Sequence, residues 1–280
     1  MQINVAQSAG FCFGVKRALG IALKTARSGI AIEMLGDIVH NEDVVREVTK
    51  VGIKKIKRLG EGTNKILLIR AHGVPQKTLK EARKRGYTII DATCPMVKEI
   101  HEIAKGAEQN GYKVIIIGDH KHDEVRGIIG QLKNKAVVIE DVKDIPLKKV
   151  KNIKKAAVVV QSTQNIEEVT KIANVLKRAI GELKFFNTIC QPTQTKQREI
   201  KGMPLENDVM IIIGSKTSAN TKRLYQISKS LNKKSYWVKS KKDIRGEWFK
   251  GAHRVGITAG ASTPDIATKT IIEHIKKMNR

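Results

Sequence analysis

Short apolar runs alternate with longer amphipathic stretches along this chain. Four of the runs read KILLIR, KVIIIG, AAVVVQS and DVMIIIGS. Runs of this length, separated by helical patterns, predict buried parallel strands joined by helices. The first residues, MQINVAQSAG, lack the basic start and apolar stretch of a secretory signal, and we expect a first strand there. The pattern therefore predicts an α/β fold.

Polar loops close the apolar runs, and they are of two kinds. One kind begins with glycine followed by Asp or Ser, and it closes the runs within residues 34–41, 116–124 and 212–221. The other kind carries His, Gln, Ser or Thr, and it closes the runs within residues 69–74, 159–165 and 257–263. In parallel α/β sheets, ligands bind beyond the carboxyl ends of the strands. We expect all six loops to face one cavity.

A cysteine in a turn-like segment precedes each pair of loops. The segments are GFCFGV around Cys12, DATCPM around Cys94 and NTICQP around Cys190. Ordinary α/β chains also place glycine and polar residues at strand ends, but a cysteine at each start indicates repeated architecture. We predict a trefoil of three similar α/β lobes with pseudo-three-fold symmetry. The predicted lobes are residues 11–93, 94–189 and 190–280, with residues 1–10 as a strand joining the third.

Composition limits the classes of function. The chain has 280 residues, 41% of them hydrophobic and only 4% aromatic, so the core must be aliphatic. No run approaches the ~18 apolar residues of a membrane span, and we expect no membrane association. The net charge of +26 would attract polyanions. Because aromatic residues do not interleave with the lysines, we interpret the charge as a solvated surface and do not expect a nucleic-acid partner.

The cysteines point to metal chemistry. There are three, an odd number and far apart, which does not fit a secreted disulfide framework and suggests a cytoplasmic protein. Buried hydrophobic cysteines are the alternative. Structural zinc would need four ligands, often in close pairs. Three thiolates can hold an iron–sulfur cluster and leave one iron open as a Lewis acid. We predict one central cluster that supports reductive removal of a hydroxyl group.

Candidate acids and anion ligands lie in the same loops. His40, His72 and His122 are candidate proton donors, and Glu124 follows two residues after His122. The third lobe offers small hydroxyl and amide donors, which bind anions or simply cap helices: Ser215, Thr217, Ser218, Asn220, Ser262 and Thr263. The chain has no GxxxxGK[ST] or GxGxxG motif, so we expect electrons from a protein donor.

Nine segments in register resemble the 4-hydroxy-3-methylbut-2-enyl diphosphate reductase family. They are GFCFGVKRA, the HN of DIVHN, RAHGV, DATCP, HDEVRG, QST, NTIC with TQ and RE after it, GSKTSAN and TAGAST. The resemblance runs from Cys12 to about Asp265. It implies a trefoil fold around one 4Fe–4S cluster. It also implies two-electron reduction of (E)-4-hydroxy-3-methylbut-2-enyl diphosphate to isopentenyl and dimethylallyl diphosphates, with the open iron binding the substrate hydroxyl.

Residue roles follow from the resemblance, motif by motif. Those matching the cluster ligands are Cys12, Cys94 and Cys190. Those matching diphosphate-binding residues are His40, His72, His122, Ser218, Asn220 and Ser262. Glu124 matches the acid that relays protons with a neighbouring hydroxyl, for which Ser162 and Thr163 are the candidates. The resemblance also implies an allylic diphosphate substrate and a ferredoxin- or flavodoxin-type electron donor.

Three positions depart from the family's pattern. Gln161 is followed by Ser162 and Thr163 where the family often has two threonines. Ala219 stands where the family has a second serine, which removes one hydroxyl from the phosphate site. Asp123 replaces a proline between His122 and Glu124, and we expect its side chain to point outward.

Two other functions remain open from the sequence. A hydratase or dehydratase would also use an open iron but would need no external electrons. A basic RNA-binding protein would bind nucleic acid in a salt-sensitive manner even without its cysteines.

Overall fold

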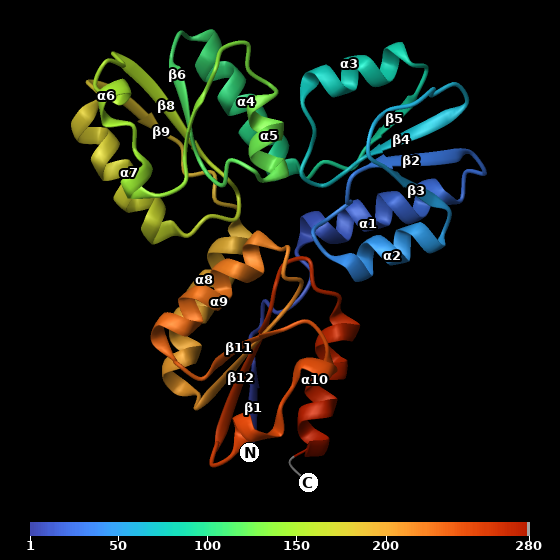
Figure 1. Ribbon diagram of the computed structural model, residues 1–280, viewed down its shortest axis with the longest axis vertical. Helices are drawn as coiled ribbons and strands as arrows, with labels where there is room; N and C mark the ends of the chain where they lie inside the picture. The colour runs from blue at the N-terminus through green and yellow to red at the C-terminus, as the bar shows by residue number, and fades with distance from the viewer. Residues whose placement is uncertain (279–280) are drawn as a thin grey trace. The chain divides into compact units, whose positions relative to one another are not determined.

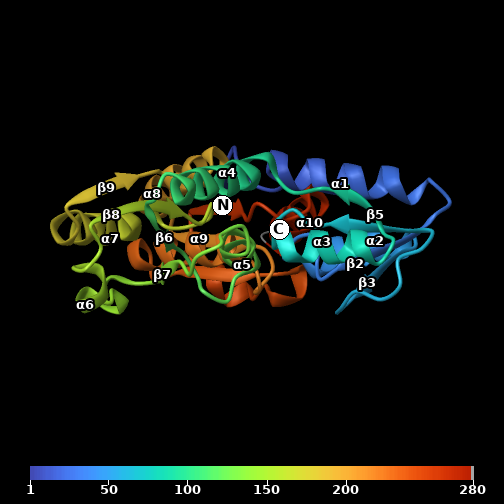
Figure 2. The same ribbon diagram turned by 90° about the horizontal axis from the view of Figure 1, so that it is seen from above.

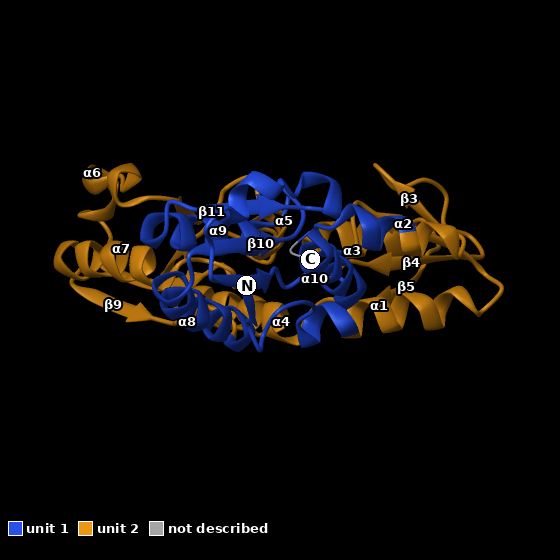
Figure 3. Cartoon of the chain, turned by 90° about the horizontal axis from the view of Figure 1, so that it is seen from below, with its two compact units in different colours: residues 1–16, 39–46, 191–280 blue, residues 17–38, 47–190 orange. Residues whose placement is uncertain are grey.

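The computed structural model describes residues 1–278, and within them lie three four-stranded sheets whose neighbouring strands are all parallel (Figure 1). Residues 279 and 280, the last two of the predicted third lobe, lie outside the described range. The chain separates into two compact units (Figure 3). Unit 1 comprises residues 1–16, 39–46 and the described residues from 191 onward, and unit 2 comprises residues 17–38 and 47–190.

The first sheet lies in unit 2 and has the strand order β3-β2-β4-β5. Its strands are β2 (Ala31–Leu35), β3 (Ile53–Ile56), β4 (Lys65–Ile69) and β5 (Thr88–Asp91). The helices of this lobe are α1 (Phe13–Ala26), α2 (Glu42–Lys50) and α3 (Gln76–Lys84). Leu67 and Ile69 of β4 pack with Ala82 of α3, which covers one face of the sheet.

The second sheet, also in unit 2, has the order β7-β6-β8-β9. Its strands are β6 (Lys113–Ile117), β7 (Val137–Ile139), β8 (Lys155–Val160) and β9 (Glu182–Phe185). The accompanying helices are α4 (Pro95–Gln109), α5 (Asp123–Ile129), α6 (Leu147–Val150) and α7 (Ile166–Ala179), with a short 3-10 helix at Val142–Asp144. The sheet separates α7 from α4 and α5 (Figures 1 and 2).

The third sheet lies in unit 1 and has the order β1-β12-β10-β11. Its strands are β1 (Gln2–Val5), β10 (Val209–Ile213), β11 (Ser235–Val238) and β12 (Arg254–Ala259). Its helices are α8 (Gln191–Glu206), α9 (Ala219–Leu231) and α10 (Asp265–Met278), with 3-10 helices at Lys241–Asp243 and Gly246–Phe249. The expected first strand is confirmed, and it pairs with β12.

The three sheets share one topology. If the strands of a lobe are counted from the one that follows the lobe's first helix, each sheet has the order second, first, third, fourth. In the third sheet the fourth position is filled by β1, from the other end of the chain. The apolar runs are buried on both faces, as parallel sheets require: Ile211 and Ile257 pack toward α10, while Ile212 packs toward α8 and α9. The prediction of three similar α/β lobes is confirmed, and their arrangement around a pseudo-three-fold axis stays a prediction.

Candidate active site

The three cysteines occupy the same position in their local folds. Each follows a strand in the fourth position and directly precedes the first residue of a long helix, α1, α4 or α8. Each backbone N–H donates to a carbonyl in the loop after a third strand. Cys12 donates to Ala261 at 3.0 Å, Cys94 to Ala71 at 2.9 Å and Cys190 to Ser162 at 3.1 Å. The three-fold repeat that the sequence predicts is therefore matched by an equivalent backbone hydrogen bond at each cysteine.

The three cysteines are less buried than core residues. All three cysteines are half-buried, and they form no disulfide in the part of the chain that the structure describes. Each cysteine lies directly before the first residue of a helix, and a helix N-terminus favours a negative charge beside it. The donor set fits an iron–sulfur cluster, which thiolates hold. Cys12 belongs to unit 1, whereas Cys94 and Cys190 belong to unit 2.

The loop after each first strand is built alike in the three lobes. It begins with glycine, Gly36, Gly118 or Gly214, whose N–H donates to the last residue of the second strand at 3.1, 3.0 and 2.9 Å, respectively. Four residues further on stand His40, His122 and Ser218. These predicted anion ligands therefore hold one repeated position, just before helices α2, α5 and α9.

Two of these residues also cap their helices. His122 Nδ1 accepts a hydrogen bond from the Glu124 N–H at 3.1 Å, and Ser218 Oγ accepts one from the Thr221 N–H at 3.3 Å. In the first lobe, Asn41 takes over this role and accepts from Asp43 at 3.0 Å. Because Nδ1 of His122 is an acceptor, its ring proton belongs on Nε2, which can donate to a ligand.

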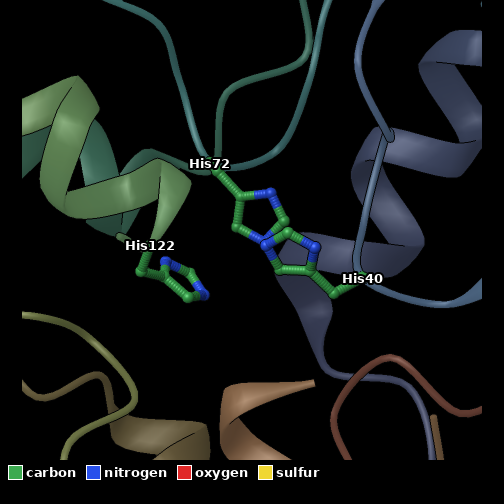
Figure 4. A group of neighbouring side chains, drawn as sticks. All are labelled: His40, His72 and His122. Carbon is green, nitrogen blue, oxygen red and sulfur yellow. The ribbon is translucent and has the colours of Figure 1, made fainter. Parts of the chain in front are cut away.

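The loops after the third strands carry His72, Thr163 and Ser262 at a second repeated position. In unit 2, the His72 and His122 rings lie edge to face, with their centroids 5.5 Å apart (Figure 4). His72 comes from the loop after β4 and His122 from the start of α5. In unit 1, the Ser262 hydroxyl donates to the His40 carbonyl at 3.2 Å.

Glu124, the acid among the predicted site residues, is buried, with 2% of its surface exposed. Its Oε1 accepts the Ser162 N–H at 2.6 Å, and its Oε2 accepts the Ser162 hydroxyl at 2.8 Å. Burial raises the pKa of Glu124, and the two hydrogen bonds from Ser162 only partly oppose the rise. Thr163 has a different partner, since its hydroxyl accepts from the Gln161 amide at 3.2 Å. Within unit 2, the structure therefore pairs Glu124 with Ser162.

Asn220 stands at the repeated position that Glu124 occupies in the second lobe. It is 4% exposed, and neither its amide nitrogen nor its amide oxygen has a hydrogen-bond partner. A buried polar group without a partner costs about 1–3 kcal/mol, and such a group is often explained by an absent ligand. The unpaired amide of Asn220 fits a binding role.

The expectation that Asp123 points outward is wrong. Its carboxylate accepts a hydrogen bond from Arg70 Nη1 at 2.7 Å, and the two side chains are only 21% and 13% exposed. Arg70 follows β4 of the first sheet, so the ion pair joins the first two lobes within unit 2. Gly36 leaves room for the guanidinium, because a Cβ there would lie 2.7 Å from Arg70 Nη1. Arg70 therefore offsets the extra negative charge that Asp123 brings.

Comparison with known proteins identifies the family. The family model described as LytB protein matches residues 3–276. The chain belongs to the LytB protein family. The family resemblance read from the nine segments is thereby confirmed.

Among its LytB relatives, the chain is 36% identical to a 4-hydroxy-3-methylbut-2-enyl diphosphate reductase of Geobacter metallireducens, over 100% of this chain and 98% of the relative. A solved structure of (E)-4-hydroxy-3-methyl-but-2-enyl diphosphate reductase has a TM-score of 0.73 and 38% identity, covering 99% of this chain and 100% of that one. A solved E-1-hydroxy-2-methyl-but-2-enyl-4-diphosphate reductase from Plasmodium falciparum has a TM-score of 0.90 at 26% identity, covering 97% and 87%.

Several residues beside the site escape sequence reasoning. Glu42 holds the repeated position of Glu124 and Asn220. Burial alone would raise its pKa, but hydrogen bonds from its own backbone, Ser215 and Lys239 lower it overall. The repeat itself could have identified Glu42, had the spacing from Gly36 been counted.

Among residues 1–278, no helix has both the length and the apolar character needed to cross a membrane.

His101 of α4 lies behind the His72 loop. It is 7% exposed, and burial lowers its pKa to about 4. A Cβ on Gly73 would lie 2.8 Å from the His101 ring, and Gly73 has a φ of +71° that favours glycine. His101 belongs to no sequence motif. Only its packing against the His72 loop in the folded structure shows that it lies beside the site.

Proposed function

We propose that this protein reduces (E)-4-hydroxy-3-methylbut-2-enyl diphosphate to isopentenyl diphosphate and dimethylallyl diphosphate, using two electrons and two protons. The observation that carries the proposal is the repeated placement of Cys12, Cys94 and Cys190 at one position of three alike sheets. Relatives that match the whole chain bear the name of this reductase. The protein is thus an enzyme, an oxidoreductase of isoprenoid biosynthesis by the methylerythritol phosphate pathway.

The same three cysteines are the proposed ligands of one 4Fe–4S cluster per chain. Thiolates are the ligands that such clusters take, and a helix N-terminus behind each sulfur supports its negative charge. When bound, a cluster held by three thiolates supplies single electrons and one Lewis-acidic iron. The dispersed, half-buried cysteines also support our proposal of a cytoplasmic location, where thiols stay reduced.

Six residues form the proposed diphosphate site: His40, His72, His122, Ser218, Asn220 and Ser262. Imidazole N–H, hydroxyl and amide groups all donate hydrogen bonds to phosphate oxygens. The tautomer that the Glu124 N–H imposes on His122 leaves Nε2 as a donor. The unpaired amide of Asn220 gains a partner when an anion binds. Ala219 supplies one donor fewer, which weakens substrate binding by about 0.5–1.5 kcal/mol.

Glu124 is the proposed proton donor. A buried carboxyl group with a raised pKa retains its proton closer to neutral pH than an exposed one. Ser162 contacts the same carboxylate through its hydroxyl and can pass a proton between Glu124 and the substrate's hydroxyl oxygen. Thr163 is the second candidate for this relay. His122 is the imidazole nearest to Glu124 in the sequence, and its ring accepts a hydrogen bond from the Glu124 N–H.

A small electron-transfer protein, of the ferredoxin or flavodoxin type, is the proposed source of electrons. The chain has neither the GxxxxGK[ST] phosphate loop nor the GxGxxG dinucleotide-binding motif. Its net charge of +26 favours an acidic partner, and the attraction between exposed charges weakens with salt. Turnover driven by such a donor should therefore slow as ionic strength rises, and a rate independent of salt would argue against the charge-based attraction.

Iron and acid-labile sulfide, counted per chain after purification without oxygen, test the proposal. We expect close to four of each in the wild type and a sharp fall in Cys94→Ser. Met96→Leu is the matched control, because Met96 Sδ lies 3.9 Å from Cys94 Sγ but is not a proposed ligand. Turnover should then require an external reductant. If the iron-loaded enzyme turns over without reductant, it is a hydratase and not a reductase. If the protein takes up no iron, the cluster proposal fails, and the basic surface is then the remaining indication of its function.

A further inference from the structure

A fully buried lysine lies in the third lobe, where sequence reasoning would place every lysine on the surface. Lys196 of α8 is 2% exposed and is among the largest fully buried side chains. Its ammonium donates to the Gly10 and Ala259 carbonyls at 3.1 Å each, and also to the Ser8 carbonyl. A buried ammonium is costly unless its hydrogen bonds are satisfied, and these carbonyls satisfy them.

Glu199, one turn further along α8, holds the same segment. Its carboxylate accepts the Ser8 N–H at 3.2 and 3.3 Å and also the Ser8 hydroxyl. Lys196 and Glu199 are three residues apart and so lie on one face of the helix. That face binds the backbone of residues 8–10, which lead directly to Cys12.

The segment is fixed at further points up to the cysteine. Gly10 has a φ of +97°, and a Cβ there would lie 2.6 Å from Asp265 Oδ1, so only glycine fits. The Cys12 N–H then donates to the Ala261 carbonyl at 3.0 Å. Ala261 lies two residues after Ala259, whose carbonyl Lys196 also binds. The Lys196 ammonium therefore binds both the segment after β1 and the end of β12, the two segments that meet at Cys12.

A similar contact precedes a second cysteine. Arg17 of α1 donates from Nη1 to the Thr93 carbonyl at 3.1 Å, and Thr93 is the residue before Cys94. In both lobes a cation from the helix that follows one cysteine binds the backbone that leads to another, since α8 follows Cys190 and α1 follows Cys12. In each case a cation therefore binds the backbone within a few residues of a cysteine.

We propose that Lys196, assisted by Glu199, is a positioning residue that holds the Cys12 segment in the geometry for cluster ligation. The inference rests on the proposed function only in taking Cys12 as a cluster ligand. Lys196 also places a cation beside this segment, and a nearby positive charge favours the more reduced state of a bound cluster. Its loss should therefore lower the cluster's reduction potential as well as loosen the backbone.

The first test uses the protein without its cluster. Hydrogen exchange of the Cys12 amide is compared between wild type and Lys196→Met, which keeps most of the side-chain volume but no charge. We expect exchange at Cys12 to be about tenfold faster, because at least one charge-assisted hydrogen bond is lost. The Cys94 amide, bonded to Ala71, serves as the internal control and should not change. Equal exchange at Cys12 in both proteins would overturn the proposal.

The second test measures cluster content and potential after anaerobic reconstitution. Lys196→Met should bind less iron and show a more negative potential, whereas Lys196→Arg, which keeps the cation, should restore most of both. Lys222→Met, an exposed lysine of α9, is the matched control. If Lys196→Met does not fold, Glu199→Ala removes the other side chain that holds Ser8, from a half-buried position, and should lower iron content alone.

The two proposals fail in different ways. A wild-type protein that binds no iron contradicts the cluster, and with it the proposed function, whatever Lys196 does. A wild type that binds four irons, beside a Lys196→Met variant with the same iron content and the same potential, contradicts only the positioning role. Equal loss of iron in Lys222→Met would also contradict it, because the effect would then not depend on the Cys12 segment.

Discussion

Ser162 donates two hydrogen bonds to the carboxylate of Glu124, one from its backbone N–H and one from its hydroxyl. Glu124 is the second residue of α5, while Ser162 follows β8, and the Ser162 carbonyl accepts the Cys190 N–H. The pair therefore links the proposed proton donor directly to the backbone of a proposed cluster ligand. Ser162 is therefore placed to pass a proton to or from this buried carboxyl group.

Glu124→Gln should abolish most turnover while leaving the cluster in place. The amide keeps the shape and can still accept the Ser162 hydroxyl, but it cannot give up a proton. General acid catalysis contributes roughly 10²–10⁴-fold, so we expect a fall in kcat of this size with little change in KM. The matched control is Glu102→Gln, an exposed residue of α4, which should retain full activity. A Glu124→Gln enzyme with unchanged kcat would exclude Glu124 as the acid.

The buried carboxyl group of Glu124 should also make the free energy of unfolding depend on pH. The pKa of Glu124 is raised in the folded state, so its contribution to stability is complete below its ordinary value of 4.5. That contribution is lost as pH rises from 4.5 through the raised pKa. Glu124→Gln lacks this loss, so the free energy of unfolding of the wild type should fall relative to the variant over that window. Denaturant unfolding of both apoproteins at several pH values gives the comparison, and parallel curves would contradict the prediction.

The Arg70–Asp123 ion pair should contribute measurably to stability. Removing one partner leaves a charge that is mostly buried, so Arg70→Met should cost more than the roughly 0–1 kcal/mol of an exposed pair but less than the roughly 3–5 kcal/mol of a fully buried one. Asp123→Asn combined with Arg70→Met should recover part of the loss. A double-mutant cycle from urea unfolding measures the coupling, and a coupling energy near zero would show that the pair is not formed in solution.

Asn220 should separate stability from substrate binding. Its amide is buried without a hydrogen-bond partner, so Asn220→Ala should leave the free energy of unfolding unchanged or raise it. The same change removes a proposed phosphate ligand and should raise KM about tenfold. Ala219→Ser, which adds a hydroxyl on the preceding residue, should instead lower KM several-fold. If Asn220→Ala destabilises the fold and leaves KM unchanged, the residue has a structural role only.

The sequence predicted the repeat but not the contacts between its parts. The cysteines, the glycine loops and the strands could be found because each is a local pattern that occurs three times. Asp123 could not be placed, because its partner Arg70 lies 53 residues away and belongs to another lobe. Lys196 could not be found either, since lysine is almost always exposed and its burial here depends on the carbonyls of Ser8, Gly10 and Ala259. Local patterns predict elements, whereas such pairings depend on the packing of distant segments.

His101 should make the protein sensitive to acid. Burial lowers the pKa of its imidazole from 6.5 to about 4, with Glu102, Lys105, Asp91 and Lys98 as its charged neighbours. Because the folded-state pKa is depressed, the neutral ring contributes stability that is present above pH 6.5 and is lost as pH falls through 4. The shift corresponds to roughly 3 kcal/mol at most.

Replacing His101 with Met should remove this dependence. The variant's free energy of unfolding should change less than that of the wild type between pH 6.5 and 4, and its His72 loop should keep its structure because no hydrogen bond from His101 Nε2 holds that loop. His120→Met, an exposed histidine in the loop after β6, is the matched control and should retain the wild-type pH dependence. An identical slope in all three proteins would mean that His101 is protonated in the folded state without cost, and that its surroundings admit water.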